Sequence, residues 1–280
     1  MKKISRRSFL AASGLTIAAL ALTACGGSAS TASSAAASSV AASSEAASTS
    51  AAAAELTTVE AGKLTMATNA AFPPYEMTTD AGAFEGIDID TAQAIADKLG
   101  LELQIDDMDF DAALLSVQQG KADIAMAGVT VTDERKNVMD FSDSYATGIQ
   151  SIIVPEGSDI ASPDDLAGKK IGTQRGTTGY IYCTDDFGED SVVAYDDGLT
   201  AVQALNNGQV DAVVIDNAPA QEFVAANPGL KVLDTSYAEE DYAIGVAKGS
   251  ALEDAVNKAL EELKADGTLQ AIVDKYINAN

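Results

Sequence analysis

The chain has 280 residues, of which 47% are hydrophobic, so it can hold one or two folded domains with a substantial core. Its 17 basic and 42 acidic residues give a net charge of −25, which argues against nucleic acid as a partner because phosphate binding needs clustered Lys and Arg. With no His and only two Cys, composition excludes a His-dependent triad, a His-ligated zinc site and a Cys–His nucleophile, and argues against a disulfide framework.

The N-terminal residues have the pattern of an export signal followed by a tether. Basic residues precede an apolar run from Phe9 to Ala24, which at about 16 residues is shorter than the roughly 20 that span a membrane. Leu22-Thr23-Ala24-Cys25 resembles the bacterial lipobox, and Ser5 to Leu10 resembles the twin-arginine export motif, so Sec and twin-arginine export both stay open. We expect a signal peptide at 1–24 and a flexible Ser/Ala-rich tether at 25–57, lipidated on Cys25. The protein would then lie on the extracellular face of the cytoplasmic membrane, attached through this lipid only.

From Leu56 onward, strand-like and helix-like segments alternate. Gly100, Gly120 and Gly208 each follow a helical pattern and mark its end, whereas the paired prolines of Phe72-Pro73-Pro74-Tyr75 predict a loop. We expect strands at 63–68, 101–105, 123–127, 149–154, 170–173, 211–215 and 242–247, and helices at 87–99, 111–119, after Ser162, after Gly179, and at 201–207, 252–263 and 269–277. This alternation is typical of a layered α/β architecture.

An internal resemblance predicts two lobes. Segments 115–125 and 205–213 share a Gln/Asn-Gly-x-x-Asp core, in which a helix ends at the Gly and a buried strand follows. Two similar α/β lobes imply a ligand cleft between them, since ligands of open α/β sheets bind beyond the carboxyl ends of the strands. The expected boundaries are 58–147 and 241–280 for lobe 1, 148–240 for lobe 2, and 145–149 and 238–242 for the two strands of a hinge.

Residues 126–136 carry the chemistry of a carboxylate site. An apolar strand ends here, Gly128 leaves backbone amides accessible, and Thr130 supplies a hydroxyl. Arg135 offers a planar fork that can hold a carboxylate through two hydrogen bonds, at the start of a short helix with Thr132 as N-cap. The alternative is that Arg135 only pairs with a neighbouring Asp on a solvated face.

Asp216, at the end of a strand in the second half, is an acid that can bind a cation. A zwitterion fits Arg135 and Asp216 together, and each buried charge needs such a partner because desolvation costs on the order of several kcal/mol. Phe72 and Phe110 can cover the rest of the ligand. The alternatives are that Asp216 only caps the following helix and that the two aromatic rings only fill the core.

Two further features predict no chemistry. The acidic run Glu239-Glu240-Asp241 lacks the ligand spacing of a Ca²⁺ loop and indicates a solvated hinge surface. Cys183 has acidic neighbours and no His to activate it, so we interpret it as a packing residue. We therefore expect neither a metal nor a cofactor.

Motifs from Leu64 to Tyr276 carry a family resemblance. They are Ala67 through Glu76, Phe84 through Asp90, Met108-Asp109-Phe110, Ala127 through Arg135, Gly176-Thr177-Thr178 and Asp211 through Asp216. Together they resemble the family 3 extracellular solute-binding proteins of polar amino-acid ABC importers. The resemblance implies two Rossmann-like α/β lobes joined by a two-stranded hinge, the type II periplasmic-binding-protein fold. It also implies a monomer that binds a free amino acid for an ABC permease and is not an enzyme.

The resemblance further implies a role for each site residue. Arg135 would clamp the α-carboxylate of the ligand, helped by amides near Thr130 and Thr178. The Gly128 carbonyl, Thr130 and Asp216 would hold the α-ammonium group. The residues that would meet the side chain of the ligand are Asn69, Phe72, Phe110, Gln174 and Thr177.

One departure from the family bears on the ligand. Many members carry an acid where Asn69 stands, so Asn69 favours a neutral polar amino acid, while the nearby acids Glu76, Asp109 and Asp111 keep a basic amino acid as the alternative.

Two other functions stay open. The first is an enzyme on the same fold, a dehydratase or a hydrolase, with Glu76 or Asp216 as its acid–base group. The second is an amino-acid sensor.

Overall fold

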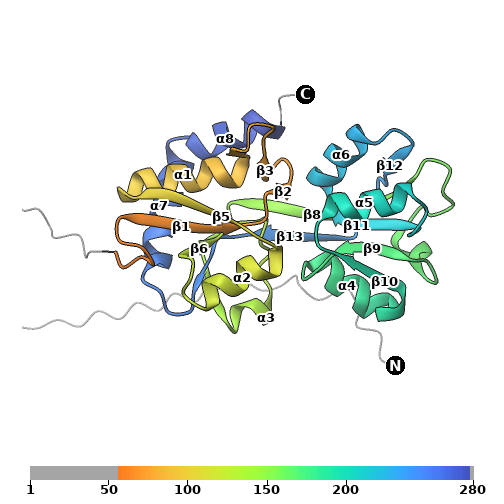
Figure 1. The fold of residues 1–280 in the computed structure, drawn as a ribbon, viewed down its shortest axis with the longest axis horizontal. Coiled ribbons are helices and arrows are strands. Elements are labelled where there is room, and N and C mark those ends of the chain that lie inside the picture. The colour runs from red at the N-terminus through yellow and green to blue at the C-terminus, as the bar shows by residue number, and fades with distance from the viewer. Residues whose placement is uncertain (1–55, 278–280) are drawn as a thin grey trace, which may run out of the picture. The chain divides into compact units, whose positions relative to one another are not determined.

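The structure is a computed structural model that describes residues 56–277 (Figure 1). The signal peptide expected at 1–24, the lipidation site Cys25 and nearly all of the expected tether lie outside the described residues. Among the described helices, none is long and apolar enough to cross a membrane.

The first sheet draws its strands from both ends of the described chain. The strands of this part are β1 (Lys63–Thr68), β2 (Ala71–Phe72), β3 (Glu76–Thr78), β4 (Phe84–Glu85), β5 (Glu102–Asp107), β6 (Ile124–Ala125), β7 (Met139–Phe141) and β14 (Gly245–Ala247). Its helices are α1 (Ile87–Leu99), α2 (Phe110–Gln118), α3 (Asp133–Lys136), α7 (Leu252–Ala265) and α8 (Thr268–Ile277). The sheet order is β5-β1-β6-β14-β7, and β2, β3 and β4 form a separate small sheet. Helices α1, α7 and α8 pack together on one side, and α2 packs against β1 and β14 on the other (Figure 1).

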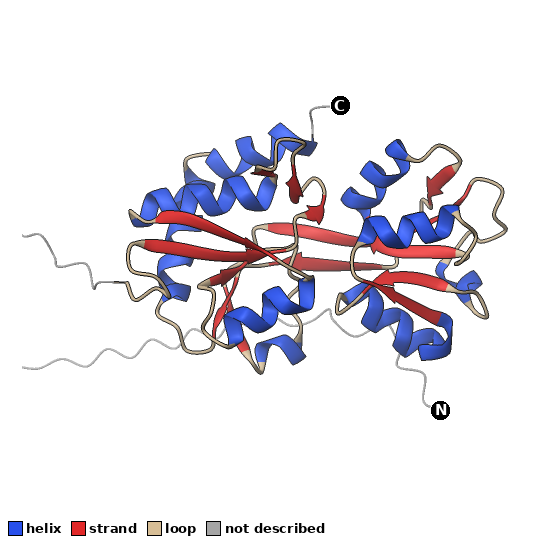
Figure 2. Cartoon of the chain, in the orientation of Figure 1, coloured by secondary structure: helices blue, strands red, loops and turns tan. Residues whose placement is uncertain are grey.

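The second sheet comes from the middle of the chain. Its strands are β8 (Ala146–Pro155), β9 (Ile171–Gln174), β10 (Val192–Tyr195), β11 (Ala212–Asp216), β12 (Leu230–Val232) and β13 (Ala238–Tyr242). Its helices are α4 (Thr178–Phe187), α5 (Gly198–Asn206) and α6 (Asn217–Ala226), with short 3-10 helices η1 (Pro163–Leu166) and η2 (Glu189–Ser191). The order is β10-β9-β11-β8-β12, with β13 paired to β8, and helices cover both faces (Figure 2).

The internal resemblance between the two halves is confirmed in atomic detail. Gly120 and Gly208 follow α2 and α5 with φ values of 66° and 67°, a backbone conformation that favours Gly. The Asp three residues later accepts a backbone hydrogen bond from the neighbouring segment in each lobe. Asp123 accepts from the Thr65 amide at 2.8 Å, and Asp211 accepts from the Lys170 amide at 2.7 Å. Each repeat therefore ends a helix and pins the start of a buried strand, β6 or β11.

The hinge strands β8 and β13 pair antiparallel, from Ala146 opposite Tyr242 to Gln150 opposite Ala238. Gly148 is required at this crossing because a Cβ there would collide with the ring of Tyr242.

One expectation is wrong: 242–247 is two strands, since β13 ends at Tyr242 and β14 begins at Gly245 in the other sheet. The chain leaves one sheet for the other between them. We keep the lobe boundaries stated above as our assignment.

The helix caps and the proline loop lie where the sequence predicts them. The Thr132 hydroxyl accepts a hydrogen bond from the Arg135 amide at 3.2 Å and caps α3, as expected. Ser162 caps η1 with Pro163 in its first turn, also as expected. The expected loop at Pro73 and Pro74 is confirmed as the turn of a tight hairpin, in which Phe72 pairs with Glu76 on either side of it.

Candidate functional site

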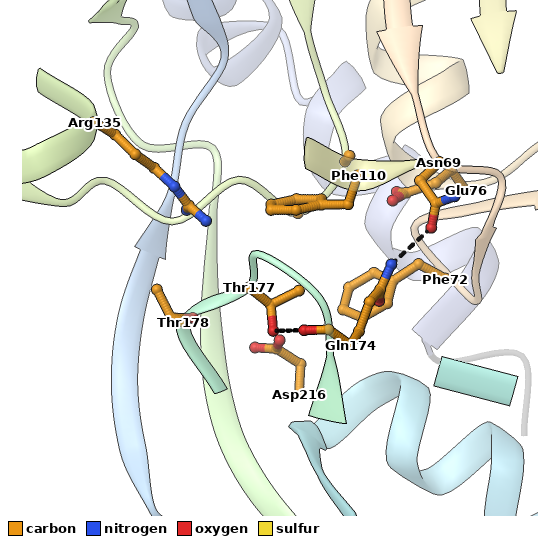
Figure 3. A pocket seen from close by; sticks show the side chains of 11 residues that line it. Asn69, Phe72, Glu76, Phe110, Arg135, Gln174, Thr177, Thr178 and Asp216 are labelled. Atoms are coloured by element: carbon orange, nitrogen blue, oxygen red, sulfur yellow. Dashed lines mark hydrogen bonds between the residues drawn. The ribbon is translucent and has the colours of Figure 1, made fainter. Parts of the chain in front are cut away.

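One pocket collects most of the residues that the sequence singles out (Figure 3). It is lined by Asn69, Phe72, Glu76, Phe110, Ala127, Gly128, Arg135, Gln174, Thr177, Thr178 and Asp216. Of the ten expected ligand-binding residues, nine line this pocket, and Thr130 does not. The free space inside the pocket is small: the centre of a water-sized sphere can move through only about 10 Å³. A free amino acid can therefore enter only if the walls move apart.

Arg135 lies at one end of the pocket and is buried. Its guanidinium donates to two backbone carbonyls, that of Thr130 at 2.7 Å and that of Gly176 at 3.1 Å, and its charge lies 5.2 Å from the centre of the Phe110 ring. Burial lowers the pKa of Arg135, while the negative charge of Glu240 opposes this. These two carbonyls use only some of the five N–H donors of the guanidinium, so the Arg135 side chain can still bind a carboxylate.

The helix α4 begins beside Arg135. Thr177 is its N-cap and accepts a hydrogen bond from the Tyr180 amide at 3.3 Å, and Gly176 before it has a φ of 75°. The first amides of a helix have no partner within the helix and carry a partial positive charge. Thr178 therefore presents a backbone amide at a point where an anion is stabilised.

Asp216 lies at the end of β11 and is buried. Its carboxylate accepts from the Gln150 side-chain amide at 2.8 Å, and although Asp216 occupies the N-cap position of α6, its side chain makes no capping bond there. Burial, together with the nearby charge of Glu240, raises its pKa to about 7, and the Tyr242 hydroxyl and the Gln150 amide oppose this. A carboxylate in such surroundings is stabilised by a cationic ligand group.

The far end of the pocket is polar but neutral. The Gln174 side-chain amide donates to the Asn69 side-chain oxygen at 2.9 Å, and Asn69 donates to the Met108 carbonyl at 2.9 Å (Figure 3). The first bond joins residues of the two lobes. Phe72 is buried and stacks on Tyr75, with ring centres 5.9 Å apart, so it belongs to the core and to the pocket wall at once.

Glu76 is fully buried beside Asp88, and both lie near the neutral end of the pocket. Burial, followed by the charge of Asp88, raises the pKa of Glu76 well above its usual value, which favours the protonated form of this carboxyl group. Burial raises the pKa of Asp88 to about 6, although the Gly128 amide and the Tyr145 hydroxyl donate to it at 3.0 Å and 2.8 Å. Glu76 therefore lines the pocket in surroundings that favour its neutral form. Neither Asp109 nor Asp111 lines it.

Glu240 is the residue that our sequence analysis placed wrongly. We expected a solvated acidic surface, but Glu240 is only 6% exposed, whereas Glu239 and Asp241 are exposed. The period-two alternation of β13 explains the difference, because Glu240 shares a face with the buried Tyr242. That alternation was the signal available in the sequence.

Thr130 stands apart from the other expected residues. Its hydroxyl donates to Glu240 at 3.1 Å, and its backbone pairs with Tyr242.

Cys183 is buried, and burial raises the pKa of its thiol to about 12, in agreement with a packing role. Within residues 56–277, no group of three or more acidic or Cys side chains is placed to hold a metal ion.

The buried acids predict that the ligand-free protein loses stability as the pH rises from 5 to 8. Because the pKa values of Asp88 and Asp216 rise from 3.8 to about 6 and about 7, the folded state binds protons more tightly than the unfolded chain. Their stabilising contribution is full below pH 4 and is lost as the pH rises through 6 and 7. The chain has no His, so few other groups titrate in this range.

We expect the free energy of unfolding to fall by on the order of 1–3 kcal/mol between pH 5 and pH 8, which lowers the melting temperature by roughly 5 °C. Calorimetric melting of the ligand-free protein measures this change. Asp216→Asn should reduce the pH dependence, because it removes one of the titrating groups. A melting temperature that rises with pH in both proteins would contradict the assignment.

Comparison with known proteins agrees with this geometry. Residues 64–279 match the family described as bacterial extracellular solute-binding proteins, family 3. The L-cystine-binding protein TcyJ of Escherichia coli strain K12 is 33% identical over 226 residues, which cover 79% of this chain and 85% of TcyJ. The arginine-, lysine-, histidine-binding protein ArtJ of Geobacillus stearothermophilus is 34% identical, with a TM-score of 0.74 over 78% of this chain and 96% of ArtJ. An ancestral arginine-binding protein bound to glutamine is 43% identical, with a TM-score of 0.74 over 77% of this chain and 98% of that protein.

Proposed function

Because this chain belongs to the bacterial extracellular solute-binding proteins, family 3, we propose that it captures a free polar amino acid outside the cell and delivers it to an ABC permease. The expected type II periplasmic-binding-protein fold, with two α/β lobes, is confirmed by the structural matches. TcyJ binds cystine and ArtJ binds arginine, lysine and histidine, so the family alone does not give the ligand of this chain.

One observation supports the proposal most directly. A buried Arg and a buried Asp from different lobes line one closed pocket, and each lacks an oppositely charged partner in direct contact. The α-carboxylate of an amino acid supplies the partner for Arg135, together with the first amides of α4. The α-ammonium group supplies the partner for Asp216. The amino acid would enter when the lobes move apart, binding would draw them together again, and the closed form would be the one that a permease recognises.

The neutral end of the pocket favours a neutral polar side chain on the ligand. Asn69 and Gln174 offer amides, and the raised pKa of Glu76 favours its neutral form, so this end of the pocket suits an uncharged polar group. A basic amino acid is the alternative, and it would require Glu76 to ionise on binding. Asp109 and Asp111 do not support this alternative because they lie outside the pocket.

Titration calorimetry with the twenty L-amino acids and cystine tests the proposal. Binding of at least one of them at micromolar concentration is the expected result, and binding of none at millimolar concentration would reject the proposed function.

The raised pKa of Asp216 would also suit an acid–base enzyme of the same fold. Chemical change of a bound amino acid on prolonged incubation would favour that enzyme.

Glu76→Gln is expected to separate neutral from basic ligands. Gln keeps the neutral shape that protonated Glu76 presents, but it cannot ionise to meet a cationic side chain. The ratio of arginine affinity to glutamine affinity should therefore fall about tenfold or more in the variant. Calorimetry of both amino acids with both proteins measures the ratio, and an unchanged ratio would show that Glu76 does not contact the side chain of the ligand.

The proposed location follows from the N-terminal sequence. Lipidation of Cys25 would hold the protein on the extracellular face of the cytoplasmic membrane, and the tether at 25–57 would let the lobes reach a permease. We propose a monomer, since one chain supplies both walls of the pocket.

A further inference from the structure

Glu240 is a buried carboxylate that no expected role accounts for. It lies on the hinge strand β13, and one of its oxygens, Oε2, accepts three side-chain hydrogen bonds. The donors are the Thr130 hydroxyl at 3.1 Å, the Thr178 hydroxyl at 3.0 Å and the Gln150 amide at 3.0 Å. Thr130 precedes the hinge and Thr178 begins a helix of the second sheet, so this oxygen joins residues of both lobes.

The direction of these bonds has a chemical consequence. A carboxylate can only accept, so both hydroxyls must give their single hydrogen to Glu240. Each hydroxyl oxygen is then left with acceptor capacity only, part of which Thr178 uses for the Gln150 amide at 3.4 Å, so it can meet a ligand only as an acceptor. Thr178 lines the pocket, where its hydroxyl favours an ammonium group and cannot donate to a carboxylate.

The same carboxylate acts on the other polar groups of the site. The Gln150 amide that donates to Glu240 also donates to Asp216 at 2.8 Å, so the two acids share one fixed donor. Among the charges near Arg135, that of Glu240 does most to raise the pKa of the guanidinium. Glu240 therefore contacts or influences the groups proposed for both ends of the ligand.

We propose that Glu240 is a positioning residue of the amino-acid site, which fixes the Thr130 and Thr178 hydroxyls of the two lobes as acceptors by taking both of their hydrogens. It touches no ligand itself. It sets the orientation of the bound zwitterion, with the ammonium group toward the Thr178 hydroxyl and Asp216, and the carboxylate toward Arg135 and the amides of α4. This inference rests on the proposed function of the pocket.

Glu240→Gln tests the proposal, with Glu239→Gln as the matched control. Both variants remove one negative charge from β13, but Glu239 is exposed on the opposite face of the strand. Calorimetry with the amino acid that the wild-type protein binds most tightly should show affinity weakened about tenfold to a hundredfold by Glu240→Gln, and within about twofold of wild type for Glu239→Gln. Equal affinity of the two variants would overturn the proposal. Failure of the wild-type protein to bind any amino acid would instead reject the proposed function.

A double-mutant cycle separates positioning from a general structural effect. If Glu240 acts through the Thr178 hydroxyl, Glu240→Gln should weaken binding much less in a Thr178→Val background than in the wild-type background. An equal loss in both backgrounds would overturn the proposal.

If Glu240→Gln does not fold, Thr178→Ser and Thr178→Val carry the test. Ser keeps the hydroxyl that Glu240 orients, so it should bind at least tenfold more tightly than Val. Equal affinity of these two variants would overturn the proposal as well.

Discussion

Replacing Arg135 with Ala is expected to weaken amino-acid binding by roughly 10²- to 10³-fold, the largest effect of any single change in the pocket. The α-carboxylate of the ligand would be buried without its charged partner, and the guanidinium also donates to the Thr130 and Gly176 carbonyls that border the site. Calorimetric titration measures the loss. Lys136→Ala is a suitable control because Lys136 follows in the same short helix and is exposed.

Arg135→Lys refines this test. Lys keeps the positive charge but loses the planar fork and the contact over the Phe110 ring, so we expect an affinity between those of the wild type and the Ala variant. Circular dichroism and melting of each ligand-free variant separate a loss of binding from a loss of folding. If the folded Ala variant binds with wild-type affinity, the carboxylate does not lie at Arg135, and the proposed orientation of the ligand is wrong.

Asp216→Asn is expected to weaken binding by roughly 10²-fold or more, because the α-ammonium group would lose its buried counter-charge. Asn has nearly the same shape and can still accept from the Gln150 amide through its oxygen, so the fold should be retained. Asp196→Asn is the matched control: it removes a charge of the same lobe from a side chain that is 73% exposed. Binding of wild-type strength by Asp216→Asn would refute the role of Asp216.

The same residue predicts how binding depends on pH. Since the pKa of Asp216 is raised to about 7, the free protein holds a proton there at lower pH, and an ammonium ligand must displace it. Wild-type affinity should therefore decline as the pH falls from 8 to 5, by up to tenfold per unit below 7. The charged groups that interact with Asp216 include Glu240, which raises this pKa, Arg135 and Glu76. Calorimetry across this range should give a nearly flat profile for Asp216→Asn, and an equally steep profile in both proteins would contradict the assignment.

Much of the fold could be predicted because its signals are local. The strand at Lys63–Thr68 and the helix that ends at Gly100 lie where apolar spacing and a positive-φ Gly indicate them. The break between β13 and β14 could not be predicted from Tyr242 to Ala247, since residues 242–246 are all buried and only the pairing of the two strands in different sheets separates them. Strand boundaries of this kind depend on tertiary pairing, which local composition does not encode.

The pocket could be predicted to the extent that its residues follow the carboxyl ends of strands. Gly128, Gln174 and Asp216 do so and line it. Glu240 was missed because its role depends on which face of a hinge strand is buried, and the acidic residues on either side of it suggested solvent. The raised pKa of Glu76 was beyond sequence reasoning as well, because it depends on burial and on the charge of Asp88, which β3 and α1 bring close to Glu76.

The position of β14 in its sheet has a consequence for biosynthesis. This strand lies between β6 and β7 in the first sheet, yet it is the last strand to be made. Until residues 245–247 emerge, the sheet consists of two unconnected pieces, β5-β1-β6 and the single strand β7, whereas the second sheet already has all of its strands. The lobe that begins first is thus finished last, and a chain released early, before Gly245, would carry one completed lobe beside an open one.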